Sequence, residues 1–516
     1  MKLTQRSKLL IPCVLPILIV AACMPSLAQM TSVGVNCSQV SALQIHKQEN
    51  MRAGRVMIEC GLAPAGRPAI GQALPPTIPN ARVSNRTCAS NSSCTKSENM
   101  IWASSADGGK TLVDTYNDHN PTFASYSGTS YSKNAGLTWK EIVPPPFATG
   151  HGTNFGDPIV VFNAKLGKFF AGDLVSGSDC GGQGIGLWTS PDGIAWTVGS
   201  CPHVGSSDDR QSMWVDNEPS SGTYGRMYVS WNNFATGGSL VVTYSDDGVV
   251  WVAPVVLNAG FIRNVQLTGS PVGAARFEGT NSTVFVATMD EGGGGLNTRQ
   301  NFIYKSLDGG ATWSSFSMGA RFNPPGNVSC GYFEAVAPIW RHMGWGQPAV
   351  GPTGVVHYAY AGAGSAGDVG DVFYVKSTDN GVTWSAPIQL NTDPDGPNKT
   401  QWMPSVSADG AGKVTATWYD RRKAAAACSI ATNPGCKYEI VGRQSTDNGV
   451  TFNAAVTISN TLIAQPQQTD PGVQACYAGD YDYDTNLNGN AYVTWTDGRR
   501  AVTGIHVQDV EFAKAP

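Results

Sequence analysis

Aspartate, arginine and one tyrosine recur in short clusters that could bind or hydrolyse a polar ligand. The clusters are Gly156-Asp157-Pro158, Asp208-Asp209-Arg210, Asp420-Arg421-Arg422, Gly479-Asp480-Tyr481 and Asp497-Gly498-Arg499. A guanidinium group binds carboxylates and other acceptors, and a carboxyl group can act as a general acid or base. The candidate catalytic residues are Asp157, Asp209, Asp420, Asp480 and Tyr481, and the candidate substrate-binding residues are Arg210, Arg421 and Arg499. The competing interpretation is structural, because Asp and Asn at strand ends often bond the next turn.

A second pattern, Ser-x-Asp-x-Gly-x-Thr-Trp and its close variants, recurs six times and sets the positions of these clusters. The copies begin at Ser132, Ser190, Ser245, Ser306, Ser377 and Ser445, which are 58, 55, 61, 71 and 68 residues apart. A period of this size indicates a repeat architecture. Each copy lies between two strand-like runs, which predicts a hairpin turn whose Asp binds backbone N–H groups and whose Gly adopts positive φ. Because six equivalent sites argue against one reaction centre, we interpret the residues at the Asp position as structural: Asn134, Asp192, Asp247, Asp308, Asp379 and Asp447.

Two more strand-like runs precede each copy, as between Gln211 and Trp231. Four strands per unit, repeated radially, predict an all-β fold, a β-propeller. We count seven four-stranded blades. The last unit, residues 480–512, lacks the pattern, so six blades remain an alternative if this unit merges with the first to close the ring.

The order of strands in a blade predicts which face carries the charged clusters. The repeated turn joins the third strand to the fourth and lies on one face, whereas innermost strands begin, and second strands end, on the opposite face. The predicted innermost strands begin near Gly156, Asp208, Gly269, Gly346, Trp402 and Gly479. The register therefore places the charged clusters in one central funnel.

The N-terminus predicts export. Lys2, Arg6 and Lys8 precede an apolar run that is too short for a membrane span, so residues 1–28 read as a signal peptide. A lipid anchor at Cys23 is the alternative. Residues 29–84 are predicted to form a helical segment, over 38–60, and a Pro/Gly-rich linker, and residues 85–516 the propeller.

The cysteines also indicate an exported protein, whether secreted, periplasmic or at the cell surface. Of 12 cysteines, ten lie beyond Cys23, an even number that predicts disulfides. The predicted pairs are Cys37–Cys60, Cys88–Cys94, Cys180–Cys201, Cys428–Cys436 and Cys330–Cys476.

Charge and composition limit the classes of partner that the chain is expected to bind. With a net charge of −4 and few clusters of Lys and Arg, the chain has no footprint for nucleic acid. We expect a monomer that binds an extracellular glycan or protein, with no transmembrane span, no cofactor and no metal site; the absence of Cys-x-x-Cys pairs makes structural zinc an unfavoured interpretation. The run Asp484-x-Asn486-x-Asn488-Gly489 echoes the start of a calcium loop, but a turn between strands is the favoured interpretation because no Glu follows at position twelve.

The repeated pattern resembles the Asp box, or BNR repeat, of the sialidase-like superfamily, over roughly residues 98–512. The runs Trp418-Tyr-Asp-Arg-Arg422 and Gly479-Asp-Tyr481 look like those of secreted bacterial BNR-repeat proteins. The resemblance implies a sialidase-like propeller and a glycoside hydrolase, with arginines for the substrate carboxylate, a tyrosine nucleophile and an acidic proton donor. This chain lacks the family's Phe/Tyr-Arg-Ile-Pro motif and has no arginine between Arg86 and Arg210. A propeller that binds a glycan or protein without turnover is therefore the second hypothesis.

Overall fold

The computed structural model describes residues 36–41, 59–62, 80–84 and 95–515, apart from 121, 274–278, 331–332, 337–339, 343, 366–367, 394–398, 425–435, 467, 469, 471–472, 474–476 and 503. The chain divides into two units, Met1–Gly71 and Gln72–Pro516.

In the first unit, the predicted disulfide Cys37–Cys60 is confirmed. The described residues include one short 3-10 helix, η1 (Cys37–Gln39), at the start of the predicted helix over 38–60. Most of that helix lies outside the described residues, as do the predicted signal peptide and the alternative lipid site at Cys23.

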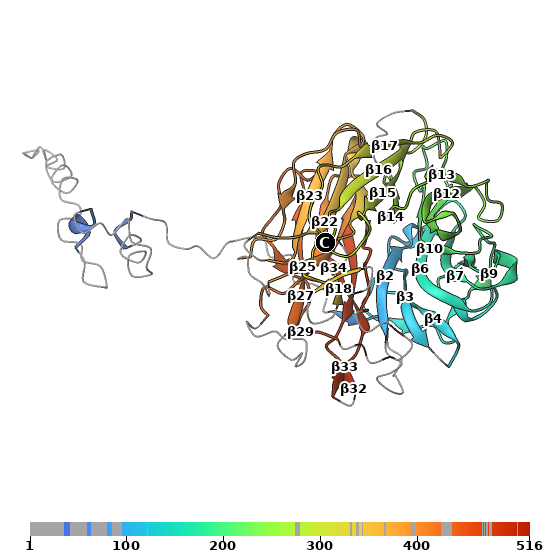
Figure 1. Cartoon of the computed structure of the whole chain (residues 1–516), viewed down its shortest axis with the longest axis horizontal. Helices are drawn as coiled ribbons and strands as arrows, with labels where there is room; N and C mark the ends of the chain where they lie inside the picture. Colours follow the sequence, from blue (N-terminus) through green and yellow to red (C-terminus); the bar gives the residue numbers. More distant parts are fainter. Residues whose placement is uncertain are drawn as a thin grey trace, which may run out of the picture. The chain divides into compact units, whose positions relative to one another are not determined.

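The second unit is a seven-bladed β-propeller, which confirms the fold and the first of the two blade counts (Figure 1). In the first six blades the strands follow one another from innermost to outermost. Blade 1 consists of β2 (Lys96–Ala103), β3 (Leu112–Asn120), β4 (Ser125–Ser132) and β5 (Lys140–Glu141). Blade 2 consists of β6 (Asn154–Asn163), β7 (Lys168–Val175), β8 (Gly184–Ser190) and β9 (Thr197–Val198). Blade 3 consists of β10 (Asp208–Val215), β11 (Met227–Asn233), β12 (Ser239–Ser245) and β13 (Val255–Asn258). Blade 4 consists of β14 (Arg263–Gly269), β15 (Val284–Asp290), β16 (Gln300–Ser306) and β17 (Ser314–Ser317). Blade 5 consists of β21 (Gln347–Val350), β22 (Val356–Gly362), β23 (Asp371–Ser377) and β24 (Ile388–Gln389). Blade 6 consists of β25 (Gln401–Ala408), β26 (Val414–Asp420), β27 (Lys437–Ser445) and β28 (Val456–Thr457), with β29 (Ile463–Ala464) also paired to β27.

The seventh blade draws its strands from both ends of the propeller. Its order from the centre is β30 (Thr485–Leu487), β31 (Asn490–Asp497), β34 (Asp509–Ala515) and β1 (Ala81–Arg82). The outermost strand, β1, pairs antiparallel with β34, so residues before 85 belong to the sheet. On the other side, β31 packs against β2 of the first blade, which closes the ring.

Each repeated turn has the predicted hydrogen bonds and lies between the third and fourth strands of its blade. In the turn after β16, Asp308 accepts hydrogen bonds from Ser306 Oγ at 2.8 Å, Thr312 N at 2.9 Å and Thr312 Oγ1 at 2.6 Å. The equivalent bonds from Thr451 lower the pKa of Asp447. These carboxylates are occupied by their own turns, as their structural interpretation requires.

The turn glycines also join each blade to the one before it. A Cβ on Gly136, which has φ +89°, would lie 2.0 Å from the ring of Phe512 in blade 7. A Cβ on Gly248 would lie 2.3 Å from Phe170 in blade 2, and one on Gly381 would lie 3.1 Å from Phe285 in blade 4. Positive φ and close approach both require glycine here. The apolar core likewise lies between blades, as where Trp214 of β10 packs with Leu267 of β14.

Short elements lie between the blades. They are η4 (Ser105–Asp107), η5 (Pro146–Ala148), η6 (Ser178–Cys180), η7 (Phe234–Thr236), η8 (Pro352–Gly354), the sheet β18 (Val328–Cys330), β19 (Phe333–Val336) and β20 (Trp340–Arg341), and the hairpin β32 (Ala501–Val502) and β33 (Ile505–His506). Asn488 and Gly489, both at positive φ, form the tight turn between β30 and β31, which matches the turn interpretation of that run. Calcium binding there is the less favoured alternative, and the structure does not test it. No helix within the described ranges is long and apolar enough to cross a bilayer.

The disulfide Cys180–Cys201 is confirmed, and Cys436 is disulfide-bonded. Cys88, Cys94, Cys428 and Cys476 lie outside the described residues, so the other predicted pairings stay predictions.

Candidate functional site

Five of the innermost strands have a β-bulge near their first residues. Each bulge turns one side chain out of the regular alternation of the strand. The bulged residues have left-handed backbones, with φ between +45° and +60°: Glu98, Asp157, Arg210, Asn264 and Met403. The register of the ladder shifts at each of these positions. Such conformations are unfavourable for residues other than glycine and gather near functional sites. Three of the five residues are charged, and they begin neighbouring blades 1, 2 and 3.

Glu98 and Asp157 form a carboxyl pair at the start of β2 and β6. Their side chains hydrogen bond to each other. Glu98 also accepts hydrogen bonds from Asn117 Nδ2 at 2.6 Å and from the backbone N–H of Asp480 at 2.9 Å. Burial, reinforced by Asp157, raises the pKa of Glu98 well above its usual value. Burial and the nearby Asp209 raise the pKa of Asp157 to about 6. Both carboxyl groups therefore keep a proton more readily than an isolated carboxyl group does.

Asp209, on the next innermost strand, has a different environment. Its side chain is 37% exposed, and it forms an ion pair with Arg263 Nη1 at 2.8 Å. The guanidinium of Arg263 lies 5.5 Å from the Phe234 ring centroid and 5.3 Å from that of Trp345. Phe234 is 39% exposed. An accessible carboxylate thus lies beside an aromatic wall.

Arg210 is enclosed by tyrosines of the segment that leads into the seventh blade. Its Cζ lies 3.7 Å from the Tyr481 ring centroid, and its Nη2 donates hydrogen bonds to Tyr483 Oη and to Asn264 Oδ1, the latter at 3.2 Å. Tyr481 stacks on Tyr483 with 4.8 Å between the ring centroids. The buried hydroxyl of Tyr481 has no hydrogen-bond partner among the residues that the structure describes.

Asp480 lies within the fields of three arginines. Arg341 Nη2 contacts Asp480 Oδ2 at 2.8 Å, and Arg210 and Arg263 also favour its ionised form. Burial outweighs these cations and raises the pKa of Asp480. Glu291, which accepts a hydrogen bond from Trp345 Nε1 at 2.6 Å, adds a further negative charge. We call this group the funnel cluster; its members are Glu98, Asp157, Asp209, Arg210, Arg263, Glu291, Arg341, Asp480 and Tyr481.

The structure thus brings together Asp157, Asp209, Arg210, Asp480 and Tyr481 from the predicted set. Asp420 instead accepts hydrogen bonds from Trp418 Nε1 at 3.0 Å and Arg422 Nε at 2.9 Å. The same arrangement recurs in the next blade. There Asp497 accepts bonds from Trp495 Nε1 at 2.8 Å and Arg499 Nε at 2.9 Å.

The buried Arg421 packs over the Trp402 ring, with 4.9 Å between its Cζ and the ring centroid, and binds Gln465. The described contacts of Asp420, Arg421 and Arg499 do not reach the funnel cluster. Their assignment to the site stays a prediction.

Sequence reasoning missed Glu98, Arg263, Glu291 and Arg341. The alternation Arg263-Asn-Val265-Gln-Leu267 could have revealed the fourth innermost strand, which we expected to begin near Gly269 and which in fact ends there. Arg341 lies in β20, which belongs to an insertion between blades. The repeat does not predict the positions of residues in such an insertion.

A cavity of about 720 Å³ lies toward the other end of the innermost strands. Met100, Trp102, Trp214 and Leu267 line it with Tyr483, whose hydroxyl contacts Arg210. The funnel cluster and this cavity are therefore separate regions that meet at Tyr483.

No family model and no curated protein matches the sequence. Several solved structures match the chain in three dimensions. An α-L-arabinofuranosidase, Arb93A from Fusarium graminearum, is 13% identical over 84% of this chain and 97% of its own, with a TM-score of 0.40. An intramolecular trans-sialidase from Ruminococcus gnavus is 11% identical over 84% and 97%, with a TM-score of 0.39. A PL25 ulvan lyase is 10% identical over 83% and 95%, with a TM-score of 0.46. At this identity and overlap, these structures assign no activity to the chain.

Proposed function

We propose that this protein is an exported glycoside hydrolase whose active site is the funnel cluster. One observation carries the proposal: two carboxyl groups on neighbouring innermost strands have opposite environments. Asp157 is hydrogen-bonded to Glu98 and has a pKa of about 6, whereas the more exposed Asp209 is ion-paired with Arg263. A buried carboxyl group with a raised pKa beside an accessible, ion-paired one is an arrangement suited to acid and base roles. We assign Asp157 as proton donor to the leaving sugar and Asp209 as base or nucleophile.

The remaining groups of the funnel cluster suit a sugar bearing hydroxyl and carboxylate groups. Arg210, Arg263 and Arg341 supply hydrogen-bond donors for such groups. The exposed rings of Phe234 and Phe261, 39% and 38% exposed, offer flat apolar surfaces for the faces of sugar rings. Because an arginine group and the free hydroxyl of Tyr481 occur together, a sialoside is the first substrate to test.

The test is release of the fluorophore from a fluorogenic sialoside and from a panel of neutral and uronic glycosides. We expect turnover of at least one, and a loss of roughly 10²- to 10⁴-fold in Asp157→Asn and Asp209→Asn. Asp246→Asn is the matched control, since Asp246 is an exposed carboxylate paired with Arg226 near a repeated turn. Equal turnover in the two funnel variants and the control would refute the residue assignment.

Binding without turnover is the alternative, favoured by the contacts that already occupy Glu98, Asp209 and Asp480. It predicts that immobilised glycans retain the protein, that no glycoside in the panel is cleaved, and that Arg263→Gln abolishes retention.

A further inference from the structure

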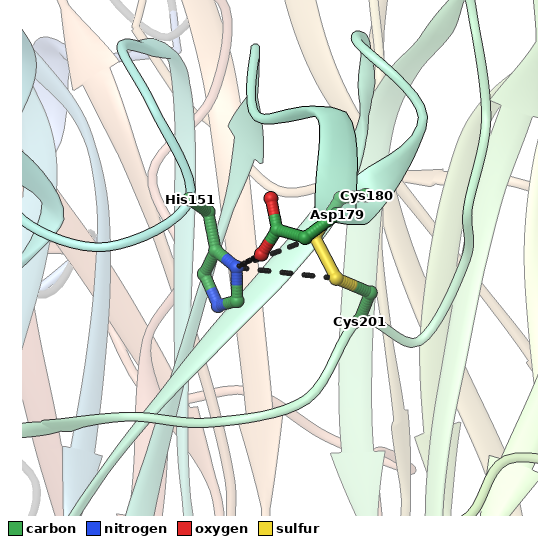
Figure 2. A group of neighbouring side chains, drawn as sticks. All are labelled: His151, Asp179, Cys180 and Cys201. Carbon is green, nitrogen blue, oxygen red and sulfur yellow. Dashed lines mark hydrogen bonds and ion pairs between the residues drawn. A yellow bond between two sulfur atoms is a disulfide. The ribbon is translucent and has the colours of Figure 1, made fainter.

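A histidine and a carboxylate lie against the disulfide of the second blade. His151 precedes β6, Asp179 and Cys180 belong to η6, and Cys201 follows β9, so three loops meet here (Figure 2). His151 Nδ1 lies 2.5 Å from Asp179 Oδ2, 3.4 Å from Cys180 Sγ and 3.9 Å from Cys201 Sγ. One potential ligand atom from each of the four residues lies within 4.8 Å of all the others.

The imidazole is held in the orientation that a metal ligand needs. Its second nitrogen, Nε2, faces the carbonyl oxygen of Leu187 at 3.1 Å and must carry a proton, because a carbonyl only accepts hydrogen bonds. The other nitrogen, Nδ1, therefore points at the sulfurs and the carboxylate. Histidines that bind metals commonly donate their other N–H to a carbonyl in this way. Gly186 makes room for the ring, since a Cβ there would lie 2.6 Å from it.

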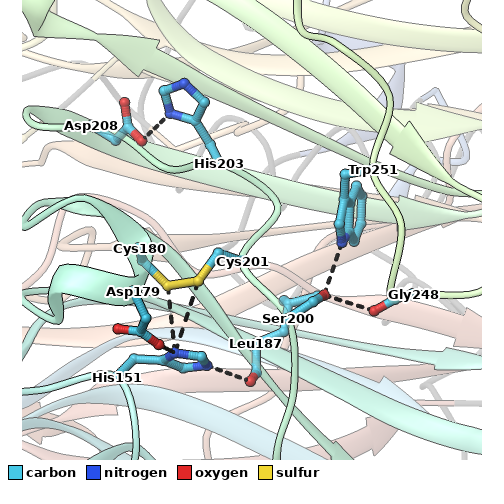
Figure 3. Close-up of a disulfide and its surroundings, with 10 residues drawn as sticks. All are labelled: His151, Asp179, Cys180, Leu187, Ser200, Cys201, His203, Asp208, Gly248 and Trp251. Carbon is cyan, nitrogen blue, oxygen red and sulfur yellow. Dashed lines mark hydrogen bonds and ion pairs between the residues drawn. A yellow bond between two sulfur atoms is a disulfide. The ribbon is translucent and has the colours of Figure 1, made fainter.

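The backbone around the cysteines has anchors other than the disulfide (Figure 3). Ser200 Oγ donates to the carbonyl of Gly248 at 2.8 Å and accepts from Trp251 Nε1 at 3.0 Å. His203 pairs with Asp208 at 2.5 Å, and the N–H of Ile185 donates to the carbonyl of His203 at 3.1 Å. These contacts anchor the Cys201 loop in addition to the disulfide.

We propose that Cys180–Cys201 is a reducible disulfide and that its dithiol form, with His151 and Asp179, is a zinc site. Zinc prefers four ligands of this type in a tetrahedron, with bonds of about 2.0–2.3 Å that place neighbouring ligand atoms about 3.3–3.8 Å apart. The distances from His151 Nδ1 to the two sulfurs are 3.4 and 3.9 Å and already suit a shared ion. The sulfurs must move apart from each other, and Asp179 Oδ2, now 2.5 Å from Nδ1, must move away from it by less than about 1 Å. The side chain of Asp179 is 56% exposed and gives the ion a path from solvent.

The redox step is thiol–disulfide exchange with a dithiol. A thiolate of the reductant attacks Sγ of Cys201, the less buried cysteine, and Cys180 leaves as a thiolate beside His151. The second thiol of the reductant then displaces Cys201 and closes a cyclic disulfide, so two electrons pass to the protein. Zinc binding releases the thiol protons and the proton between His151 Nδ1 and Asp179 to solvent.

The test titrates the purified full-length chain with Co²⁺ and Zn²⁺ under anaerobic conditions, before and after reduction by a phosphine. We expect one tightly bound metal per reduced chain, thiolate-to-cobalt charge-transfer bands, and no such bands in the oxidised chain. His151→Gln should weaken binding at least tenfold. The variant Cys37→Ser/Cys60→Ser, which lacks the other described disulfide pair, should bind as the unmodified chain does.

A second readout does not depend on any variant. In the reduced chain, Zn²⁺ should protect Cys180 and Cys201 from alkylation, as mapped by peptide mass spectrometry, and leave Cys37 and Cys60 reactive. Equal alkylation with and without zinc would overturn the proposal. Unfolding of the second blade on reduction, without refolding when zinc is added, would also overturn the proposal.

Discussion

The guanidinium carbon of Arg210 lies 3.7 Å from the centre of the Tyr481 ring, so a buried cation from blade 3 covers a phenol from the segment that leads into blade 7. The same guanidinium donates to Tyr483 Oη. The two tyrosines are thus stacked and equally buried, yet only one hydroxyl has a protein partner in the described part of the chain. This difference separates a hydroxyl that stabilises the fold from one that has no hydrogen-bond partner among the described residues.

Tyr481→Phe should leave the melting temperature unchanged or raise it, because it removes a buried hydroxyl that has no hydrogen-bond partner among the described residues. Turnover of a responsive glycoside should fall at least tenfold if the hydroxyl contacts the substrate. Tyr483→Phe is the control: it should lower stability by about 1–3 kcal/mol, since it leaves a donor of Arg210 unpaired. Calorimetry and initial rates measure both effects, and a Tyr481→Phe variant with unaltered kinetics would remove Tyr481 from the site.

The dependence of kcat/KM on pH should report the ionisation of the proposed proton donor, Asp157. Asp157 can donate a proton only while protonated, and its pKa is about 6. We therefore expect kcat/KM to fall about tenfold per pH unit above pH 6. Arg263→Gln should move this limb upward by removing a cation that favours the ionised form of Asp157. A basic limb that stays in place in this variant would contradict the assignment.

Stability should also depend on pH through Asp484. Burial raises the pKa of this carboxyl from 3.8 to about 8 in the folded protein. The folded state then holds a proton that the unfolded chain releases, so stability declines as pH rises from about 4 toward 8, by about 1.4 kcal/mol per pH unit. Asp484→Asn should flatten this slope in denaturant titrations at pH 5, 6 and 7.5. A slope as steep as that of the unmodified chain would show that other groups cause it.

The turn glycines give a prediction about the ring itself. Gly136→Ala adds a methyl group 2.0 Å from the Phe512 ring at a position with φ +89°, so it should cost about 2–4 kcal/mol. Gly237→Ala has a similar backbone, φ +83°, with nothing within 4 Å of the added carbon. It should therefore show the backbone strain alone. Equal losses in the two variants would mean that contact with the preceding blade contributes nothing.

The repeat made the fold predictable because each turn marks the end of a third strand and so gives the direction of every strand in its blade. That direction correctly placed Asp157, Asp209, Arg210, Asp480 and Tyr481 together. It could not reveal Glu98 or Arg341, for two different reasons. Glu98 reaches Asp157 only because a bulge rotates it from the regular alternation, and Arg341 lies in an insertion that interrupts the repeat. The sequence pattern of Asp420 and Asp497 resembles that of the site, but their tryptophan and arginine neighbours already bind them.

The two-residue strand β1 makes the last blade depend on the order in which the chain is made. Ala81 and Arg82 emerge early, yet their partners on β34, Phe512 and Glu511, emerge after every other blade. Until then the ring is a six-bladed arc with two open edges, which are places where other chains can pair. The brevity of β1 is protective, because two residues make a poor template for such pairing. A newly synthesised chain should therefore be most sensitive to proteases and to aggregation in the interval before β34 is available to pair with β1.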